Sequence, residues 1–599
     1  SIVWATHSYE LLGKGFAPSD RITPSRVTGN YANLIQPRSE KSKYEQKDRT
    51  KIRAEVFTPT WLVAKQNGYV ESELGSLNLE EYVDLRLLEI TCGEAPYMVT
   101  RYDTVTGEEI PLSERVGFVD RKLQRISREV SDEVTFYDLV KKAYQASYGY
   151  EYQGDSLLLA RENLLTTFED YYLAKTGNQP TLEQKKEIAT IISYNVFQMD
   201  GLKKNSPYSA TQGQSQQLSL FPDELEVEQA EESKTQIKDW KKNKMIGFER
   251  LSSEESEMKF DVVIGNPPYQ DNTLGENISF APPVYHNFLD ESVKIADRSI
   301  LITPGRFLFN AGGTPKSWNN KILTNEHVKV EYYEQDSSKV FSGTDIKGGV
   351  AIIYQDNNSL FEPIDTFTPF KELNEILHLV MSKNLDSFTK IVSGRGVYKL
   401  SKRALEEYPE IEKIQSKGHK YDVGSGAFRI LKNIIFSEEK KFDSQISFLG
   451  LYNSKRVYYY ADEKNFALPD HFYKYKVFIP KSNGSGAIGE VLSTPLIGEP
   501  LIGATETFLS IGGFETYTEA SNCLKYIKTK FARALLGVLK ITQDNTKEKW
   551  AKVPLFNFSV NSDIDWSQSV SDIDRQLYEY FDLTPEHIAF IETHVREMD

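Results

Sequence analysis

DVVIGNPPYQ, at residues 261–270, decides the fold class of this 599-residue chain. The apolar run Val262–Ile264 predicts a buried strand, and two prolines then stop it, because proline lacks an N–H and has a fixed φ. The strand therefore ends at Gly265, and residues 266–269 form a rigid turn at its carboxyl end. Ligands of open α/β sheets bind at that end. The alternative is an ordinary strand-ending turn, because Pro and Gly often only interrupt structure.

Apolar runs and helical patterns alternate along the first 370 residues. A long helix is expected at 155–175, with Asp155 or Ser156 as its cap. Strands are expected at 85–90, 146–152, 191–198, 260–265, 299–303, 328–335 and 348–355. This alternation predicts an α/β fold, with βαβ units and a parallel sheet.

Composition changes along the chain predict its domains. Residues 1–50 are polar and are expected to form an N-terminal arm, and 51–370 form the α/β domain. Within it, 203–235 is rich in Gln, Ser and acidic residues, which predicts a flexible insertion. Short aromatic strands, Gly-rich turns and a helical stretch at 518–540 predict a second domain, of α+β type, at 371–599.

The bulk composition excludes several classes of protein. Hydrophobic residues make up 39% and charged residues 26%, as in ordinary globular proteins. No apolar run is long enough for a membrane span or a secretory leader. Cys92 and Cys523 are too few for a disulfide framework and fit a reducing cytoplasm. No histidine or cysteine spacing predicts a metal site, so we expect no metal, no membrane and a cytoplasmic protein.

Charge is distributed unevenly around a net value of −15. Residues 371–552 carry 28 Lys and Arg against 21 Asp and Glu, whereas the rest carries 43 against 65. The basic part suits a polyanion such as nucleic acid, and the acidic part does not.

Glycine and acidic residues follow successive predicted strands. LEITCGEAPY at 88–97 leaves a strand through Gly93, and ASYGYEYQGD at 146–155 ends one at Glu151. NVFQMDGL at 195–202 ends another at Asp200. A glycine in the first turn lets a ligand approach the backbone, and a carboxylate at the second strand end suits paired ribose hydroxyls. We therefore expect an adenosyl ligand at this edge of the sheet.

Together with NPPY, these segments resemble the motifs of the γ-class, TaqI-like, S-adenosylmethionine-dependent N6-adenine DNA methyltransferases, and among them the restriction-modification methylases. The resemblance is strongest at 51–355. It implies a Rossmann-like class I methyltransferase sheet with helices on both faces, S-adenosylmethionine as cofactor, and a C-terminal target-recognition domain. One departure bears on cofactor affinity: Ala95, next to Glu94, stands where the family has a second glycine.

The resemblance also implies roles for single residues. EVFTP at 55–59 resembles the motif that closes over the methionine end of the cofactor. Glu89 takes the position that faces the methionine ammonium, Glu151 that of the ribose-binding acid, and Asp200 that of the acid near the adenine amino group. KVFSGTDIKGGVAI at 339–352 resembles the motif that supplies a second aromatic. The cofactor-binding residues implied are Phe57, Thr58, Pro59, Glu89, Thr91, Gly93, Glu151, Tyr152, Asp200 and Gly201.

The NPPY turn suits methyl transfer to an amino group. The adenine amino nitrogen is a poor nucleophile, because its lone pair is delocalised into the ring. Carbonyl acceptors from the Asn266 side chain and the Pro267 backbone hold both amino hydrogens and direct the lone pair at the methyl group. Pro267 and Pro268 restrain the backbone, so the acceptor is preorganised. Asn266, Pro267, Pro268 and Tyr269 are thus the candidate catalytic residues, and alignment supplies most of the rate.

The target atom lies inside a duplex, so the base must be flipped out. We expect Tyr269 and Phe341 to stack on its two faces, at about 1–3 kcal/mol per base. A core aromatic is the alternative for Phe341. The basic second domain suits target recognition, and a solvated charged face is the alternative for each cation. The candidate DNA contacts are Arg395, Lys455, Arg456, Lys474, Lys476 and Lys481.

The expected partners are double-stranded DNA and a separate restriction endonuclease. A combined restriction enzyme is disfavoured, because the roughly 50 residues before EVFTP are too few for a nuclease domain. QLSLF, at Gln217–Phe221 in the predicted insertion, resembles the bacterial sliding-clamp-binding peptide. In that resemblance Leu218, Leu220 and Phe221 fill an apolar pocket of the clamp.

Three functions stay open on the sequence. The first is a site-specific N6-adenine DNA methyltransferase, working beside a nuclease or alone. The second has the same chemistry on RNA adenine or a protein glutamine amide, which the long basic domain disfavours. The third is a DNA-binding subunit with a degenerate methylase core, which Ala95 suggests and the intact NPPY argues against.

Overall fold

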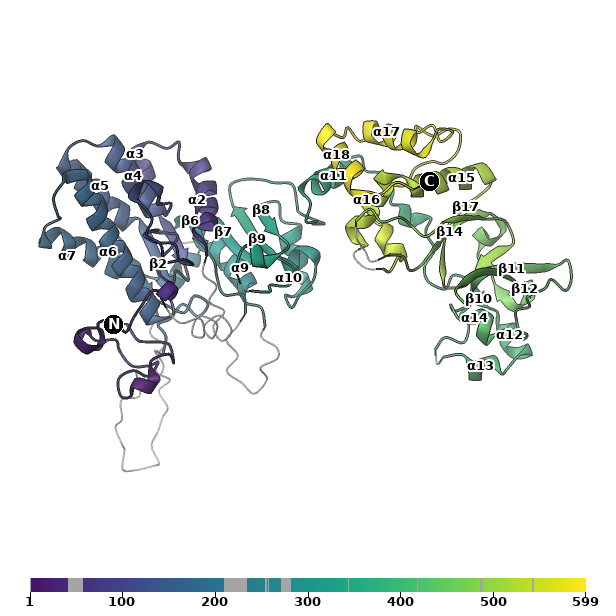
Figure 1. Ribbon diagram of the computed structural model, residues 1–599, viewed down its shortest axis with the longest axis horizontal. Coiled ribbons are helices and arrows are strands. Elements are labelled where there is room, and N and C mark those ends of the chain that lie inside the picture. The colour runs from purple at the N-terminus through teal and green to yellow at the C-terminus, as the bar shows by residue number, and fades with distance from the viewer. Residues whose placement is uncertain are drawn as a thin grey trace, which may run out of the picture. The chain divides into compact units, whose positions relative to one another are not determined.

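The structure is a computed structural model, and it describes residues 2–40, 58–208, 234–253, 256, 258–270, 282–342, 344–416, 418–484, 488–540 and 543–598. Phe57 and the QLSLF stretch at 217–221 lie outside these ranges, as does most of the predicted insertion. The chain divides into two compact units, Ser1–Pro369 and Phe370–Asp599. Each unit is described by itself (Figure 1).

Unit 1 is built on a seven-stranded sheet in the order β3-β2-β1-β6-β7-β9-β8. The strands are β1 (Leu87–Ile90), β2 (Ser147–Glu151), β3 (Val196–Gln198), β6 (Phe260–Gly265), β7 (Ala296–Pro304), β8 (Val328–Glu334) and β9 (Val350–Asp356). The first five in this spatial order pair in parallel, and β9 is antiparallel to both neighbours. The predicted α/β class, with a mostly parallel sheet, is confirmed, and this arrangement is consistent with a methyltransferase fold.

Side chains of β6 alternate between two apolar cores, as the two-residue period of a strand requires. Val262 and Ile264 belong to one core and Val263 to the other. The first core holds buried side chains of α2 (Thr60–Leu74), α4 (Phe118–Glu129), α5 (Glu133–Gln145), α6 (Gly154–Thr176) and α7 (Leu182–Asn195), and the second those of α9 (Tyr285–Ile295) and α10 (Lys316–Leu323). Helices therefore pack on both faces of the sheet (Figure 1).

Two local predictions in unit 1 are wrong. The expected strand at 191–198 is helix α7 as far as Asn195, because Ile188, Ile191 and Ile192 form the buried face of a helix. Gln153, not Asp155 or Ser156, is the cap residue of α6, and it makes no side-chain cap bond. The Asp155 carboxylate instead accepts a hydrogen bond from the Tyr9 hydroxyl, at 2.8 Å.

Residues 2–40 pack on the ends of β3 and α6. Trp4, Tyr9 and Phe16 form a small apolar cluster of their own. The Val3 backbone exchanges two hydrogen bonds with the Gln198 amide, at 2.9 and 2.8 Å. The Trp4 carbonyl accepts from the N–H of Gly154, the first residue of α6. Any side chain at Gly154 would meet the Val3 oxygen at 2.0 Å, so this docking requires glycine.

The ends of the predicted insertion lie together. Asn205 and Lys234 form an antiparallel bridge, and the Thr235 N–H donates to the Lys204 carbonyl. A hairpin of β4 (Gln236–Asp239) and β5 (Lys244–Gly247) follows.

Unit 2 combines short sheets with helices. One sheet has the order β12-β11-β16 and another β15-β14-β17. The strands are β11 (Gln445–Tyr452), β12 (Lys455–Asp462), β14 (Tyr475–Pro480), β15 (Leu496–Gly498), β16 (Ile502–Ala504) and β17 (Phe508–Phe514). The longer helices are α11 (Lys371–Ser382), α15 (Tyr517–Lys528), α16 (Lys530–Leu539), α17 (Val570–Tyr580) and α18 (Pro585–His594). The predicted helix at 518–540 is thus two helices, divided at Thr529. Among the described residues, no helix has the length and apolar character needed to cross a membrane.

Candidate active site

The candidate site lies where the parallel strands end. Glu89 of β1 is level with Gly149 of β2 and Ile264 of β6, so the carboxyl ends of three neighbouring strands meet at one edge. The strand order also reverses between β1 and β6, since β2 and β3 lie beyond β1 and β7 lies beyond β6. Such a reversal opens the crevice in which α/β proteins bind ligands.

The turn that follows β1 has a strained backbone. Thr91, Gly93 and Ala95 have φ values of 47°, 54° and 62°, in the left-handed region that favours glycine. For Thr91 and Ala95, which have a Cβ, this conformation costs about 1–3 kcal/mol each, whereas Gly93 adopts it readily; such strain gathers at ligand-binding sites. A Cβ at Gly93 would meet no atom within 4 Å, so the space beside this backbone is open to a ligand.

Glu151, at the end of β2, is tied to that turn. One carboxylate oxygen accepts from the Gly93 N–H at 2.8 Å and the other from the Gln153 N–H at 3.0 Å. The structure therefore brings together the predicted glycine and the predicted ribose-binding acid, with Tyr152 next along the chain.

The Glu89 carboxylate is buried and accepts from the Met98 N–H at 2.9 Å. Burial raises its pKa well above the ordinary value, and the nearby Glu151 adds to the rise, whereas the backbone N–H groups of Tyr97 and Met98 oppose it. Glu89 therefore holds the loop after β1 in place, which the sequence did not indicate.

Asp200, which follows β3, shapes its own turn. One carboxylate oxygen accepts from the N–H groups of Leu202 and Lys203, both at 3.0 Å. The Asp200 side chain and Gly201 are partly exposed, so both remain accessible at this edge of the sheet.

The NPPY turn is anchored to two of the predicted cofactor residues. The Asn266 side-chain N–H2 donates to the Thr58 hydroxyl at 3.3 Å, and the Asn266 backbone carbonyl accepts from the Thr91 hydroxyl at 3.4 Å. Thr58 itself is buried, and the next residue, Pro59, occupies the N-cap position of α2. Because the oxygen and nitrogen of an amide lie on opposite branches, the Asn266 carbonyl is directed away from Thr58.

The two predicted stacking aromatics are buried. Tyr269 is 8% and Phe341 3% exposed, and both belong to the same apolar core. Burial raises the pKa of the Tyr269 hydroxyl, and the nearby Asn266 side chain lowers that pKa in part. In this conformation each ring packs as a core side chain, and stacking on a base stays a prediction.

Most of the predicted DNA contacts of unit 2 have protein partners. Arg395 pairs with Glu506 at 3.1 Å and Lys474 with Glu515 at 2.6 Å, and Arg456 donates to the Thr494 carbonyl at 2.7 Å. Lys455 is exposed at the start of β12, and Lys481 is partly exposed.

Lys476 does not fit the predicted contact with DNA. Its side chain is fully buried, and its ammonium donates to the carbonyls of Phe472, Glu499 and Ile502 at 2.9–3.1 Å. Burial lowers its pKa to about 7. Residues 476–479 of β14 are all buried, so both faces of this strand are covered, and in this structure the lysine holds a turn of unit 2 rather than facing a ligand.

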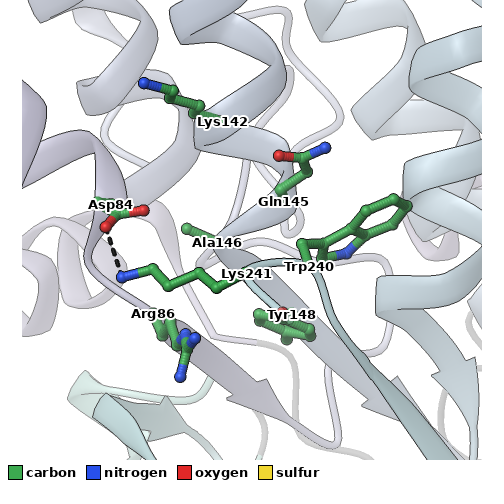
Figure 2. A pocket seen from close by; sticks show the side chains of 8 residues that line it. All are labelled: Asp84, Arg86, Lys142, Gln145, Ala146, Tyr148, Trp240 and Lys241. Atoms are coloured by element: carbon green, nitrogen blue, oxygen red, sulfur yellow. Dashed lines mark ion pairs between the residues drawn. The ribbon is translucent and has the colours of Figure 1, made fainter. Parts of the chain in front are cut away.

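A cavity of about 150 Å³ lies apart from these residues, at the opposite ends of the strands (Figure 2). Arg86 directly precedes β1, Ala146 directly precedes β2, and Lys241 of the β4–β5 hairpin forms an ion pair with Asp84 at 2.5 Å. The cavity is lined by Asp84, Arg86, Lys142, Gln145, Ala146, Tyr148, Trp240 and Lys241. It is therefore not the candidate active site.

Two further residues touch the NPPY turn or its anchor, and the sequence did not single them out. Gln66 of α2 donates to the Ile300 carbonyl at 3.1 Å and lies 3.5 Å from that of Gly265. The Tyr97 hydroxyl donates to the Gln66 carbonyl oxygen, and burial raises its pKa while the neighbouring Thr58 side chain lowers it in part. Gln66 was detectable in principle, because it is a polar residue at the i+4 and i+3 positions from Leu62 and Val63, on the buried face of α2.

No group of three or more His, Cys, Asp or Glu side chains suited to a metal ion occurs among the residues with described positions.

Comparison with known proteins gives a family match for part of unit 1. Residues 146–341 match the family described as "Eco57I restriction-modification methylase". This confirms the predicted resemblance to restriction-modification methylases over that region. The match contains β2, the NPPY turn and Phe341, and ends before β9.

A relative with a related description is an "Uncharacterized adenine-specific methylase" of Mycoplasma pneumoniae. It is 30% identical over 122 residues, which are 18% of this chain and 29% of the relative. The chain thus spans less than a third of that protein's length.

Solved structures similar to the chain include two restriction-modification enzymes. One is the "ATP-dependent Type ISP restriction-modification enzyme LlaBIII bound to DNA", with 13% identity, a TM-score of 0.33, and coverage of 97% of this chain and 42% of that one. The other is a nuclease-deletion mutant of the Type ISP enzyme LlaGI with a DNA substrate mimic, with 12% identity, a TM-score of 0.35, and coverage of 98% and 51%.

Proposed function

We propose that this protein is an adenine-specific DNA methyltransferase of a restriction-modification system. It transfers a methyl group from S-adenosylmethionine to the N6 amino group of an adenine flipped out of duplex DNA. The position of Asn266 carries the proposal: it follows β6 directly, at the strand-order reversal, and is bonded to Thr58 and Thr91. The family match over residues 146–341 supports the same chemistry.

The residues at the strand ends fit S-adenosylmethionine. The open space beside Gly93 admits the cofactor against the backbone, and the adjacent Glu151 carboxylate suits paired ribose hydroxyls. Glu89 is assigned to the methionine ammonium and Asp200 to the adenine amino group, with Thr58, Pro59, Thr91, Tyr152 and Gly201 around them, and Phe57 before them in the chain. When bound, S-adenosylmethionine supplies an electrophilic methyl group.

Asn266 and Pro267 prepare the acceptor nitrogen. The Asn266 side-chain carbonyl and the Pro267 backbone carbonyl accept the two amino hydrogens, which directs the nitrogen lone pair toward the methyl group. Pro268 restrains Pro267 to an extended backbone, so the second acceptor needs no rearrangement. Water takes the proton after transfer, so no strong base is required, and alignment supplies most of the rate.

Tyr269 and Phe341 are assigned to the faces of the flipped base. Because both rings are buried in the same core, the base enters only when their packing opens. Stacking on aromatic side chains, at about 1–3 kcal/mol per base, offsets the loss of that packing.

Unit 2 is assigned to target recognition, because it contains the basic part of the chain. Lys455, Arg456, Arg395, Lys474 and Lys481 are the candidate contacts, and each is exposed or partly exposed. The ion pair of Lys474 with Glu515 is exposed on both sides, so a DNA phosphate can replace that carboxylate at little cost, whereas Arg395 is held by the largely buried carboxylate of Glu506. A separate endonuclease and, through Gln217–Phe221, a sliding clamp complete the proposed set of partners, in the cytoplasm.

Transfer of labelled methyl groups tests the function. Wild-type protein with labelled S-adenosylmethionine and mixed-sequence duplex DNA is expected to label the DNA on N6 of adenine. Asn266→Ala is expected to reduce the rate by about 10²–10³-fold, as for loss of one positioned polar group in other enzymes, while cofactor binding by calorimetry stays the same.

The other outcomes identify the alternatives. Label found only in RNA or protein would move the substrate to a different class. Cofactor binding without any transfer would mark a degenerate methylase core. Equal rates for wild-type protein and Asn266→Ala would overturn the assigned mechanism.

A further inference from the structure

Residues 151–155 connect the end of β2 to the start of α6, and residues 2–22 hold them through hydrogen bonds. The Gln198 side-chain N–H2 donates to the Val3 and Tyr152 carbonyls, both at 2.8 Å. The Gln198 side-chain oxygen accepts from the Val3 N–H at 2.9 Å. This side chain, at the end of β3, therefore joins residues 2–22 to the first residue after β2.

Two more contacts lie at the start of α6. The Gly154 N–H donates to the Trp4 carbonyl at 2.9 Å. The Tyr9 hydroxyl donates to the Asp155 carboxylate at 2.8 Å. The first N–H groups of a helix have no acceptor within the helix, and α6 has no side-chain cap bond. Trp4 thus supplies an acceptor that the helix itself lacks.

These contacts are buried, so water competes poorly for them. Val3 is 3%, Gln198 8% and Asp155 0% exposed. The backbone of residues 2–22 also lies directly on α6, because a Cβ at Gly154 would meet the Val3 carbonyl oxygen at 2.0 Å.

The segment held in this way carries the candidate ribose-binding acid. The Glu151 carboxylate accepts from the Gly93 N–H at 2.8 Å and from the Gln153 N–H at 3.0 Å. Gln153 lies between Tyr152 and Gly154, and the backbones of both are bonded as described above. Docking of residues 2–22 therefore restrains one of the two backbone donors that orient the Glu151 carboxylate.

We propose that residues 2–22 are a positioning element for the cofactor site. By holding residues 152–155, they keep the Glu151 carboxylate ordered before S-adenosylmethionine arrives. A ligand that meets an ordered site loses less affinity to the ordering of the protein. The effect is reciprocal, because bound cofactor must strengthen the docking of residues 2–22 by the same factor. This inference rests on the proposed function and adds a segment outside the motifs that implied it.

Gln198→Leu tests the inference through cofactor affinity. It removes all three Gln198 bonds and keeps a side chain of similar size. We expect the Kd for S-adenosylmethionine, measured by calorimetry, to rise about 5- to 150-fold, the usual range of coupling between two sites. The KM for DNA, and kcat at saturating cofactor, are expected to change much less.

Asn195→Leu is the matched control. Asn195 directly precedes β3, at the opposite end of the strand from Gln198. Its buried side-chain N–H2 likewise donates to backbone carbonyls, at 2.9–3.1 Å, namely those of Tyr144, Gln145 and Ser147. Both variants are therefore expected to lower the melting temperature, and only Gln198→Leu to raise the Kd for S-adenosylmethionine. Equal Kd values for the two variants would overturn the positioning role.

Gly154→Ala tests the docking without changing Gln198. Alanine favours a helix more than glycine does, so at a free helix start this change would stabilise the protein. We expect the opposite, a lower melting temperature and weaker cofactor binding, because the new methyl group meets the Val3 carbonyl. A raised or unchanged melting temperature would overturn the inference.

Hydrogen-exchange mass spectrometry separates this inference from the proposed function. Without cofactor, Gln198→Leu is expected to speed amide exchange in residues 2–22 and 151–155, whether or not the protein methylates DNA. In the wild-type protein, S-adenosylmethionine is expected to slow exchange in residues 2–22. Unchanged exchange of both segments in Gln198→Leu would overturn the inference. Wild-type protein that shows this change but binds no S-adenosylmethionine would overturn the proposed function alone.

Discussion

At the scale of single residues, the role proposed for Glu89 predicts that cofactor binding depends on pH. Burial raises the pKa of its carboxyl well above the ordinary value, so the free folded protein holds this proton at pH values where an exposed glutamate has lost it. The proposed partner of Glu89 is the methionine ammonium, which favours the ionised form. Cofactor binding below the pKa of Glu89 therefore releases a proton, and affinity rises with pH until the free protein is itself ionised.

Isothermal titration of S-adenosylmethionine in two buffers with different ionisation heats measures this proton. We expect release in the wild-type protein and an affinity that increases from low to neutral pH. Glu89→Gln is expected to bind more weakly, without proton release. Asp574→Asn is the control, because Asp574 of unit 2 is also a buried carboxyl, with a pKa raised to about 6 by burial. Release that persists in Glu89→Gln would contradict the assignment.

Residues near each other in a motif were easier to predict than residues joined only by the fold. Gly93 and Glu151 were expected at neighbouring strand ends, and the parallel register does bring them within a hydrogen bond. Tyr97 and Gln66 were not expected, because their contact depends on how α2 lies on the sheet, which no spacing in the sequence encodes. Lys476 was expected to contact DNA, but it is buried because other parts of unit 2 cover both faces of β14, which no spacing in the sequence encodes.

At the scale of elements, a boundary could be predicted where the local sequence leaves the backbone no alternative, as proline does. β6 spans Phe260–Gly265, as expected, because the prolines allow no other end. The helical stretch at 518–540 was expected to be continuous, because no proline interrupts it. Its division at Thr529 depends on side-chain bonds: Thr529 accepts from the Ala532 N–H, and Asp574 of α17 accepts from those of Lys530 and Phe531.

Thr529→Ala tests whether this cap stabilises α16. Loss of a threonine cap costs about 0.5–2 kcal/mol, so backbone amides of residues 530–539 are expected to exchange hydrogen about 2–30 times faster where opening is local. Hydrogen-exchange mass spectrometry of peptides from α16 measures the change. Thr593→Ala is the control, because its exposed hydroxyl donates only to the Ala589 carbonyl inside α18. Equal hydrogen-exchange rates in α16 for both variants would show that the Thr529 side chain does not stabilise this helix.

At the scale of the whole molecule, the net charge of −15 conceals a basic region in unit 2. If this region binds DNA phosphates, the affinity falls as salt rises, because each neutralised phosphate releases counterions. Lys455 is exposed and Lys476 is buried, although both belong to unit 2. The two lysines should therefore contribute differently to the salt dependence of the affinity for DNA.

Fluorescence anisotropy of labelled duplex DNA at several salt concentrations tests this difference. Lys455→Ala is expected to reduce the slope of log affinity against log salt by about 1, as for loss of one phosphate contact. Lys476→Met is expected to leave that slope unchanged, since its ammonium is used on backbone carbonyls. The reverse pattern would place Lys476 in the interface and require unit 2 to rearrange on DNA.

The docking of residues 2–22 onto β3 and α6 has a consequence for synthesis. Val3 is bonded to Gln198, 195 positions later in the chain, and Trp4 to Gly154. At a translation rate of about 5–20 residues per second, Val3 therefore waits roughly 10–40 s for its partner to be made. During that interval the aromatic side chains of Trp4, Tyr9 and Phe16 have no sheet edge to cover. We therefore expect the nascent chain to expose these three aromatic side chains, and exposed apolar surface of this kind is what chaperones bind.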